Sequence, residues 1–182
     1  MPRPKADMSE IKAAIMDAAE RRMQAGGFFA FSFREIAGDV GIKSSSVHYH
    51  FPTKEDLAAA VIRRWSENTA AHVDKEFEKD PDAIRVWTKA FRGTAVSAPH
   101  MCPCTVLGAS SHDLPEQVAA EVQSFFAMCQ NKMIAQGMSK VKATEFLSTI
   151  VGAMVVANAL HETAAYDRAT KGLLEEQKSS AA

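Results

Sequence analysis

The spacing of apolar residues along the chain predicts helices almost throughout. The first apolar series recurs at helical spacing from Ile11 to Met23, with Ser9 as the candidate N-cap. Gly26 and Gly27 follow it and supply a C-terminal stop. Strand-like alternation bounded by turns does not occur. The pattern therefore predicts an all-α protein.

Two short helices are predicted next. Ser32 stands three residues before a glutamate, which is the capping-box spacing, and the helix that it begins closes at Gly41. The second begins near Ser44 or Ser45 and ends before Pro52, because a residue that precedes proline is pushed out of the α region. Two short helices joined by a tight glycine-containing turn form a helix-turn-helix.

Longer helices are predicted in the rest of the chain. Thr53 caps one whose apolar residues recur every four positions, and Leu114 and Pro115 open another. The last runs from about Val141 to Tyr166, followed by a tail expected to fray. The breaks between helices are predicted at residues 79–82, 97–104 and 135–140.

These elements predict two domains. Residues 1–52 form a small three-helix helix-turn-helix domain, and residues 53–182 form a larger helical bundle that the helix from residue 53 enters. A hydrophobic content of 47% in 182 residues supports such cores and argues against disorder.

The distribution of charge and of apolar runs limits the class of protein. A net charge of −1 excludes a uniformly basic nucleic-acid coat, although residues 1–64 carry ten Lys and Arg against eight Asp and Glu. The start is polar, without the apolar segment of a secretory signal. The longest apolar run, near Ile150–Leu160, falls short of the ~20 residues that cross a bilayer. We therefore expect a cytoplasmic protein without a membrane span, whose N-terminal part faces anions.

The helix-turn-helix segment combines inward apolar residues with an outward polar set. Ala37 allows a close helix crossing, Gly41 permits the turn and Ile42 fills the space between the helices, while Val47 and Phe51 anchor the second helix. Each outward residue alone is common in caps or on solvated surfaces, but together they suit a helix in the major groove. The predicted DNA contacts are Ser32, Arg34, Lys43, Ser44, Ser45, Ser46, His48, Tyr49, His50 and Lys54.

Residues 9–65 resemble the DNA-binding domain of the TetR family of transcriptional regulators. The most specific part is the stretch FSFREIAGDVGIKSSSVHYHFPTKEDL, with its REIA…GI and YHFPTKEDL segments. The resemblance implies a three-helix DNA-binding domain and a helical C-terminal domain that dimerises and usually binds a small effector. Such proteins are mostly repressors that their ligand releases from double-stranded operator DNA.

One position departs from the family pattern. The family commonly has tyrosine where His48 stands, whereas here Tyr49 comes one place later. One helical residue is a rotation of about 100°. The resemblance therefore implies a phosphate contact for the pair His48 and Tyr49, without deciding which residue makes it.

The C-terminal part contains candidates for an effector pocket and a dimer interface. Apolar and aromatic residues with a few polar ones are the usual lining of ligand cavities, although each is also an ordinary core residue. The predicted pocket residues are Trp65, Trp87, Phe91, Met101, Cys102, Leu107, Met128, Asn158 and His161. The helix from Leu114 and the one from Val141 to Tyr166 are predicted to form a two-fold four-helix bundle with a second subunit, because their apolar residues exceed the needs of one small core. The alternative is that these residues form an ordinary monomer core. These residues are Phe125, Phe126, Met133, Phe146, Ile150, Met154 and Ala157.

The cysteines and histidines suggest weaker alternatives. Cys102 and Cys104 lack the spacing of structural zinc ligands, so we expect no metal or cofactor, even with His100 and His112 nearby. The histidines are dispersed and accompany no carboxylate pair in a di-iron pattern, so no enzyme is expected. An oxidant-sensing or electrophile-sensing repressor that uses Cys102, Cys104 or Cys129 is the alternative function, against plain reduced core thiols.

Overall fold

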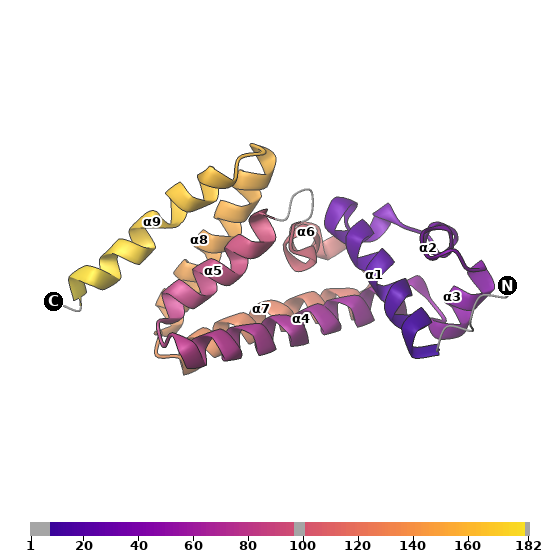
Figure 1. Cartoon of the computed structure of the whole chain (residues 1–182), viewed down its shortest axis with the longest axis horizontal. Coiled ribbons are helices and arrows are strands. Elements are labelled where there is room, and N and C mark those ends of the chain that lie inside the picture. Colours follow the sequence, from indigo (N-terminus) through magenta and orange to yellow (C-terminus); the bar gives the residue numbers. More distant parts are fainter. Residues whose placement is uncertain (1–7, 97–100, 181–182) are drawn as a thin grey trace, which may run out of the picture.

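The computed structural model describes residues 8–96 and 101–180, which form helices joined by short turns (Figure 1). Within those residues there is no strand, so the all-α prediction is confirmed. The elements in chain order are α1 (Met8–Gly26), the 3₁₀ turn η1 (Phe28–Ala30), α2 (Phe33–Val40), α3 (Ser44–His50), α4 (Lys54–Lys79), α5 (Ala83–Val96), α6 (Pro103–Gly108), the 3₁₀ turn η2 (Ser111–Asp113), α7 (Glu116–Ala135), α8 (Lys140–Ala159) and α9 (Thr163–Ser180).

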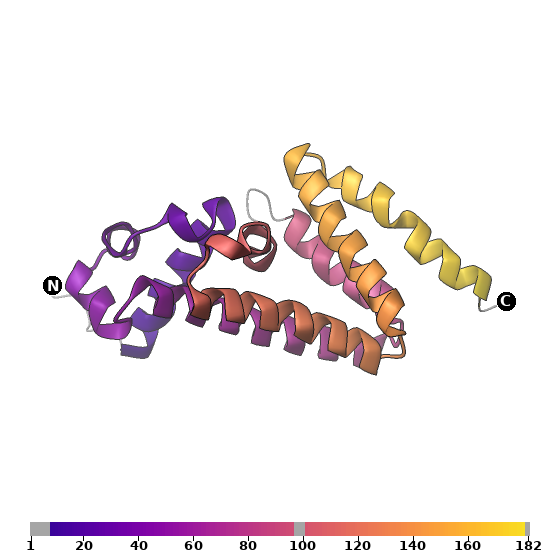
Figure 2. The same cartoon turned by 180° about the vertical axis from the view of Figure 1, so that it is seen from behind.

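The helices form an elongated molecule. The helix-turn-helix, α2 and α3, lies with α1 at one end, and α5, α8 and α9 lie at the other (Figures 1 and 2). Helices α4 and α7 run side by side between the two ends, and α6 lies against α1 (Figure 2). The buried residues of both ends form one contiguous apolar cluster, to which α4 contributes along its length.

Local signals located the N-terminal helices well. Thr53 caps α4: its Oγ1 accepts the backbone N–H of Asp56 at 3.1 Å, and the Asp56 carboxylate accepts the Thr53 N–H at 3.1 Å. Helix α1 ends at Gly26 as expected. Its start differs, because α1 already includes Met8, so Ser9 lies inside the helix and is not its cap.

Two features of the C-terminal half differ from the prediction. The preceding helix, α5, ends at Val96, as the predicted break at residues 97–104 requires, and residues 97–100 of that break lie outside the described residues. The short helix α6 was not predicted; Pro103 occupies its first turn, where the missing N–H of proline costs nothing. The single helix predicted from Val141 to Tyr166 is two helices, and the tail expected to fray belongs to α9.

His161 explains why the end of α8 was missed. Its φ of 53° is left-handed, and the N–H of Glu162 donates to the carbonyl of Ala157 at 2.9 Å while the N–H of His161 donates to Asn158 at 3.1 Å. This is a Schellman closure, which glycine usually makes. Because histidine stands in the left-handed position, the sequence carries no glycine signal there.

The apolar residues assigned to dimerisation are used within one chain. Six of the seven are at most 3% exposed, and only Phe126 is partly buried. The helix containing Tyr166 completes this core, since the Tyr166 hydroxyl donates to the Thr88 carbonyl at 2.9 Å. The argument from surplus apolar residues is therefore wrong, because other helices of the same chain pack on both helices: α4, α6 and α8 on α7, and α5, α7 and α9 on α8.

Helix α8 is the one element of the described residues that is long and apolar enough to cross a membrane by length and composition alone. Its buried residues, which include Phe146, Ile150 and Met154, belong to the core shared with α5 and α9. Packing inside the protein accounts for part of this apolar composition, since Val141, Val155 and Val156 of the same helix are exposed.

Two glycines of the helix-turn-helix should respond oppositely to alanine. Gly41 has φ 74°, and Gly38 lies within α2; a Cβ at either position meets no atom within 4 Å. Gly41→Ala should lower the free energy of unfolding by about 1–2 kcal/mol, the cost of a left-handed residue with a Cβ. Gly38→Ala should raise it by about 0.5–1 kcal/mol, because alanine favours the helix. Urea unfolding followed by circular dichroism measures both, and shifts of the same sign would contradict the assignment of the turn.

Candidate nucleic-acid interface

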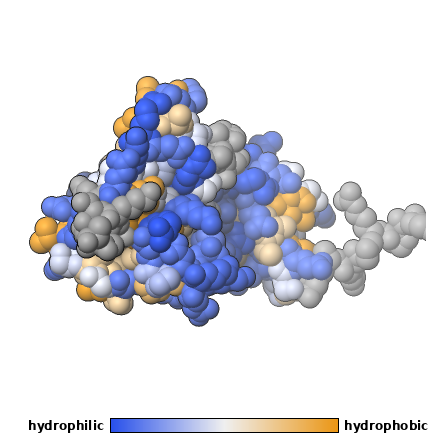
Figure 3. All heavy atoms as spheres, turned by 60° about the vertical axis from the view of Figure 1, so that its left-hand side comes forward, coloured by the Kyte–Doolittle hydropathy of each residue, from blue (hydrophilic) through white to orange (hydrophobic). Residues whose placement is uncertain are grey.

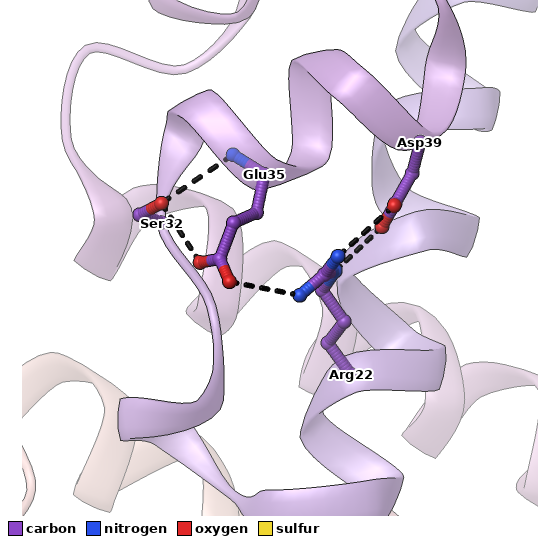
Figure 4. Close-up of polar contacts among 4 residues, drawn as sticks. All are labelled: Arg22, Ser32, Glu35 and Asp39. Atoms are coloured by element: carbon purple, nitrogen blue, oxygen red, sulfur yellow. Dashed lines mark hydrogen bonds and ion pairs between the residues drawn. The ribbon is translucent and has the colours of Figure 1, made fainter.

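The first helix of the helix-turn-helix is fixed at its start by a serine cap. The Oγ of Ser32 accepts the backbone N–H of Glu35 at 3.4 Å and donates to the Glu35 carboxylate at 2.8 Å (Figure 4). These bonds hold the pKa of Glu35 below its usual range, first through the Ser32 hydroxyl and further through Arg22. The cap predicted from the spacing of Ser32 and Glu35 is confirmed.

Arg22 joins α1 to both ends of α2. Its Nε and Nη2 donate to the two carboxylate oxygens of Asp39 at 2.5 and 3.0 Å, and its Nη1 donates to Glu35 at 3.2 Å (Figure 4). The same bonds lower the pKa of Asp39. Sequence patterns did not reveal Arg22, because its two partners lie in another helix. It orients α2 against α1 and thereby positions the turn that follows.

The turn between α2 and α3 is a Schellman closure. Gly41 adopts φ 74° and donates its N–H to the Gly38 carbonyl at 3.3 Å, while the N–H of Ile42 donates to the Ala37 carbonyl at 2.9 Å. Ile42 then packs on the core beside Ala37. This geometry, predicted from the glycine, sends the chain directly into α3.

Helix α3 presents a polar face to solvent because its apolar residues are buried on the opposite side. Val47 is fully buried and Phe51, which follows the helix, is 4% exposed. Ser45, His48 and Tyr49 are exposed and lie at i, i+3 and i+4, which places them on one face of the helix. Such a face, with short serines that permit close approach, suits a major groove.

His48 and Tyr49 differ in how firmly the protein holds them. The His48 ring packs edge-on against Phe33 of α2, with 4.6 Å between ring centroids. Tyr49 is 70% exposed, and its ring lies edge-on to that of His50, with 5.3 Å between ring centroids. His48 therefore offers a pre-positioned ring nitrogen, whereas Tyr49 offers the longer reach.

The Lys54 side chain is already engaged within the protein. Its ammonium lies 4.5 Å from the Phe28 ring centroid, 4.7 Å from that of Phe31 and 5.8 Å from that of Phe29. Burial there lowers the Lys54 pKa, against the opposing effect of Glu55. A phosphate contact by this side chain, as predicted from sequence, would compete with or add to these ring contacts, since Lys54 is only half-buried.

The other predicted contacts surround this face. Arg34 and Lys43 are exposed, as is Ser32, whose hydroxyl is occupied by the cap. Ser44, Ser46 and His50 are half-buried. The structure thus places nine of the ten predicted residues on α2, α3 and the turns beside them, and the tenth, Lys54, at the start of α4.

A second candidate site is a cavity of about 220 Å³ in the middle of the molecule. It is lined by residues of α1, α4, α5 and α7 and by one residue just before α6. These are Glu20, Trp65, Asn68, Thr69, His72, Ala90, Phe91, Thr94, Cys102 and Phe125.

Three of the nine predicted pocket residues, Trp65, Phe91 and Cys102, line this cavity. Trp87 is fully buried, with its Nε1 donating to the Gln136 side chain at 2.7 Å. Of the remaining five, Leu107 is fully buried, Met101 and Met128 pack on the core, and Asn158 and His161 are exposed around the end of α8. These six residues do not line the cavity.

The residues that sequence reasoning missed divide into two kinds. Asn68, Thr69 and His72 follow Trp65 at helical spacings of three, four and seven residues. The helical spacing from Trp65 is therefore sufficient to predict that these three residues line the same cavity. Glu20 had no such signal, because only the packing of α1 against α4 brings it to the cavity.

The three cysteines are free and buried. Burial raises the pKa of Cys104 and of Cys129. Burial also acts to raise the Cys102 pKa, but hydrogen bonds from Cys104 and Thr105 outweigh it and lower that pKa. The oxidant-sensing alternative stays a prediction, and burial limits the access of an oxidant to all three thiols. In residues 8–96 and 101–180, no cluster of three or more His, Cys, Asp or Glu side chains could hold a metal, and His100 lies outside these residues.

A helix-turn-helix that presents a polar recognition face, joined to a helical bundle with an internal cavity, defines the class of DNA-binding transcriptional regulators. Comparisons agree with this class. The model of the bacterial regulatory proteins of the tetR family matches residues 15–61. No curated protein matches the sequence.

Solved structures of regulators resemble the whole chain. A TetR-family transcriptional regulator from Agrobacterium tumefaciens is 28% identical, with a TM-score of 0.83 over 93% of this chain and 98% of that chain. A TetR regulator from Legionella pneumophila is 24% identical, with a TM-score of 0.82 over 94% and 97%. The reduced form of NemR from E. coli shares the fold at 13% identity and a TM-score of 0.74 over 90% and 96%. Residues 15–61 thus match the tetR family of bacterial regulatory proteins, and the chain shares the fold of TetR-family transcriptional regulators.

Separate replacement of His48 and Tyr49 by phenylalanine should identify the phosphate contact. Each change keeps an aromatic ring and removes hydrogen-bonding atoms, so His48→Phe retains the packing against Phe33. Loss of one hydrogen bond to phosphate should weaken DNA binding by about 3–10-fold. Fluorescence anisotropy with a duplex selected by the wild-type protein from a random pool measures this. Unchanged affinity in both variants would contradict a phosphate contact by either residue.

Proposed function

We propose that the protein is a homodimeric repressor that a small molecule releases from double-stranded operator DNA. The observation that carries this proposal is that the cavity borders α1, the helix on which α2 is fixed. A ligand in the cavity therefore touches the support of the DNA-binding helices directly. The proposal includes a cytoplasmic location, no membrane span, no cofactor and no enzymatic activity.

In the proposed complex, α3 enters the major groove. Ser45, His48 and Tyr49 face the DNA, with Lys43 and Arg34 beside them. Serines give little strong discrimination between bases, so Lys43 and the shape of the DNA supply much of the specificity. Ser32, Ser44, Ser46, His50 and Lys54 complete the proposed contact set.

The proposed dimer uses α8 and α9, revised from the residues suggested by sequence. Val155, Val156 and Leu160 at the end of α8 are 43%, 51% and 58% exposed. Gly152 and Ala159, also exposed, would let a second helix approach closely. Seen from this end of the molecule, hydrophobic residues form separate patches on a mostly hydrophilic surface (Figure 3). Two such subunits would place two recognition helices on half-sites ~34 Å apart.

Operator binding should depend steeply on salt. If each subunit contacts about three phosphates, a dimer neutralises about six, and affinity should fall roughly a thousandfold between about 50 and 200 mM salt. Anisotropy titrations with promoter DNA of the protein's own gene measure the slope, and a scrambled duplex is the control. Equal binding to both duplexes at low salt would contradict a specific repressor.

A charge on the exposed end of α8 should separate the subunits. Val156→Glu places a carboxylate in the proposed interface, so the protein should elute as a monomer, with its far-ultraviolet circular dichroism unchanged because Val156 is 51% exposed. Val141→Glu is the matched control, because Val141 is 67% exposed at the other end of α8.

Light scattering of the three proteins gives the oligomeric state. A wild-type monomer, or a dimer that persists in Val156→Glu, would contradict the proposed interface.

A further inference from the structure

The cavity combines aromatic rings with a single acidic side chain. Trp65, Phe91 and Phe125 supply three rings to its wall. Glu20 is its one acidic residue, and neither lysine nor arginine is among its lining residues. Aromatic faces and a carboxylate both attract cations, and the attraction grows when the site is shielded from water.

The charge of Glu20 is only partly neutralised by the protein. Nη2 of Arg64, on α4, lies 2.8 Å from the Glu20 carboxylate, but Nη1 of the same guanidinium lies 2.7 Å from Asp17. One cation therefore serves two carboxylates, which leaves one negative charge in excess. The Glu20 and Arg64 side chains are 22% and 25% exposed, whereas Asp17 is 55% exposed.

We propose that the effector is a small organic cation with an aromatic or apolar body, held by Glu20 and the surrounding rings. An anion would meet the Glu20 carboxylate in a lining without lysine or arginine, where His72 is the one side chain able to carry a positive charge and Arg64 is already paired with Glu20 and Asp17. A volume of about 220 Å³ lies below the roughly 300–1,000 Å³ of sites for drug-sized molecules, which favours a compound of about one substituted ring.

The position of Glu20 also gives the ligand a route to the DNA-binding helices. Glu20 is the one lining residue contributed by α1, and Arg22, two residues later, holds α2 through Asp39 and Glu35. A cation bound to Glu20 competes with Arg64 and so weakens the attachment of α1 to α4. This coupling rests on the proposed repressor function, whereas the preference of the cavity for cations does not.

Phenyltrimethylammonium and its uncharged isostere tert-butylbenzene test the charge preference. Both should be titrated into the full chain by calorimetry. We expect the wild-type protein to bind the cation at least about tenfold more tightly than the isostere, since a desolvated cation–π contact with a carboxylate exceeds about 1.4 kcal/mol. Equal affinities, or no binding of phenyltrimethylammonium at millimolar concentration, would overturn the proposal.

Glu20→Gln and Asp17→Asn form a matched pair of variants. Each removes one carboxylate charge from Arg64, but only Glu20 lines the cavity. Glu20→Gln should lose about tenfold in affinity for phenyltrimethylammonium and keep its affinity for tert-butylbenzene, whereas Asp17→Asn should change less than about twofold. Equal losses in both variants would overturn the role of Glu20, and unfolding midpoints report whether either variant is folded.

A DNA-binding readout separates this proposal from the repressor function. Phenyltrimethylammonium should weaken the wild-type operator complex and have about tenfold less effect on Glu20→Gln. If the protein binds operator but phenyltrimethylammonium does not bind the protein, the cationic class is wrong and the repressor stands. If specific DNA binding fails, the calorimetric titrations still decide the ligand class.

Discussion

The α1 helix is held on two sides at once, and the position of the DNA-binding helices depends on this arrangement. Its apolar face, from Ile15 to Met23, is fully buried and forms the centre of the N-terminal core. Arg22 ties it to α2, and Glu20 ties it to Arg64 of α4. A displacement of α1 relative to α4 would therefore reach α2 through side chains that are already in contact.

Helices α2 and α3 depend on α1 for their position because they are too short to be stable alone. Helices α2 and α3 have 8 and 7 residues, below the ~12–15 residues at which an isolated helix becomes even marginally stable in water. They persist because Ile36 and Val47 are buried, and because the Ser32 cap and the Schellman turn satisfy the two ends of α2. Their orientation is consequently a property of the surfaces beneath them, which α1 and the start of α4 provide.

The cavity and the proposed dimer surface lie in the part of the chain where local patterns carried least information. An apolar residue such as Phe146 or Ile150 looks the same in a sequence whether it faces its own core or a second subunit. Packing within the chain buries both residues, because α8 lies against α5, α7 and α9, and the closure at His161 turns α9 back onto α5 and α8. What remains outside, at Val155, Val156 and Leu160, is a smaller surface than the sequence indicated.

The sequence by itself determined the all-α class, the caps at Ser32 and Thr53, the glycine turn at Gly41 and the buried positions of Val47 and Phe51. Each of these depends on residues within about four positions of one another, so a pattern in the chain is sufficient to reveal it. The tertiary structure alone decided that Arg22 reaches Asp39, 17 residues away, and that Arg64 reaches Glu20, 44 residues away. Such pairs form only when packed helices bring distant positions together. For this reason the sequence alone did not predict that Glu20 lines the cavity.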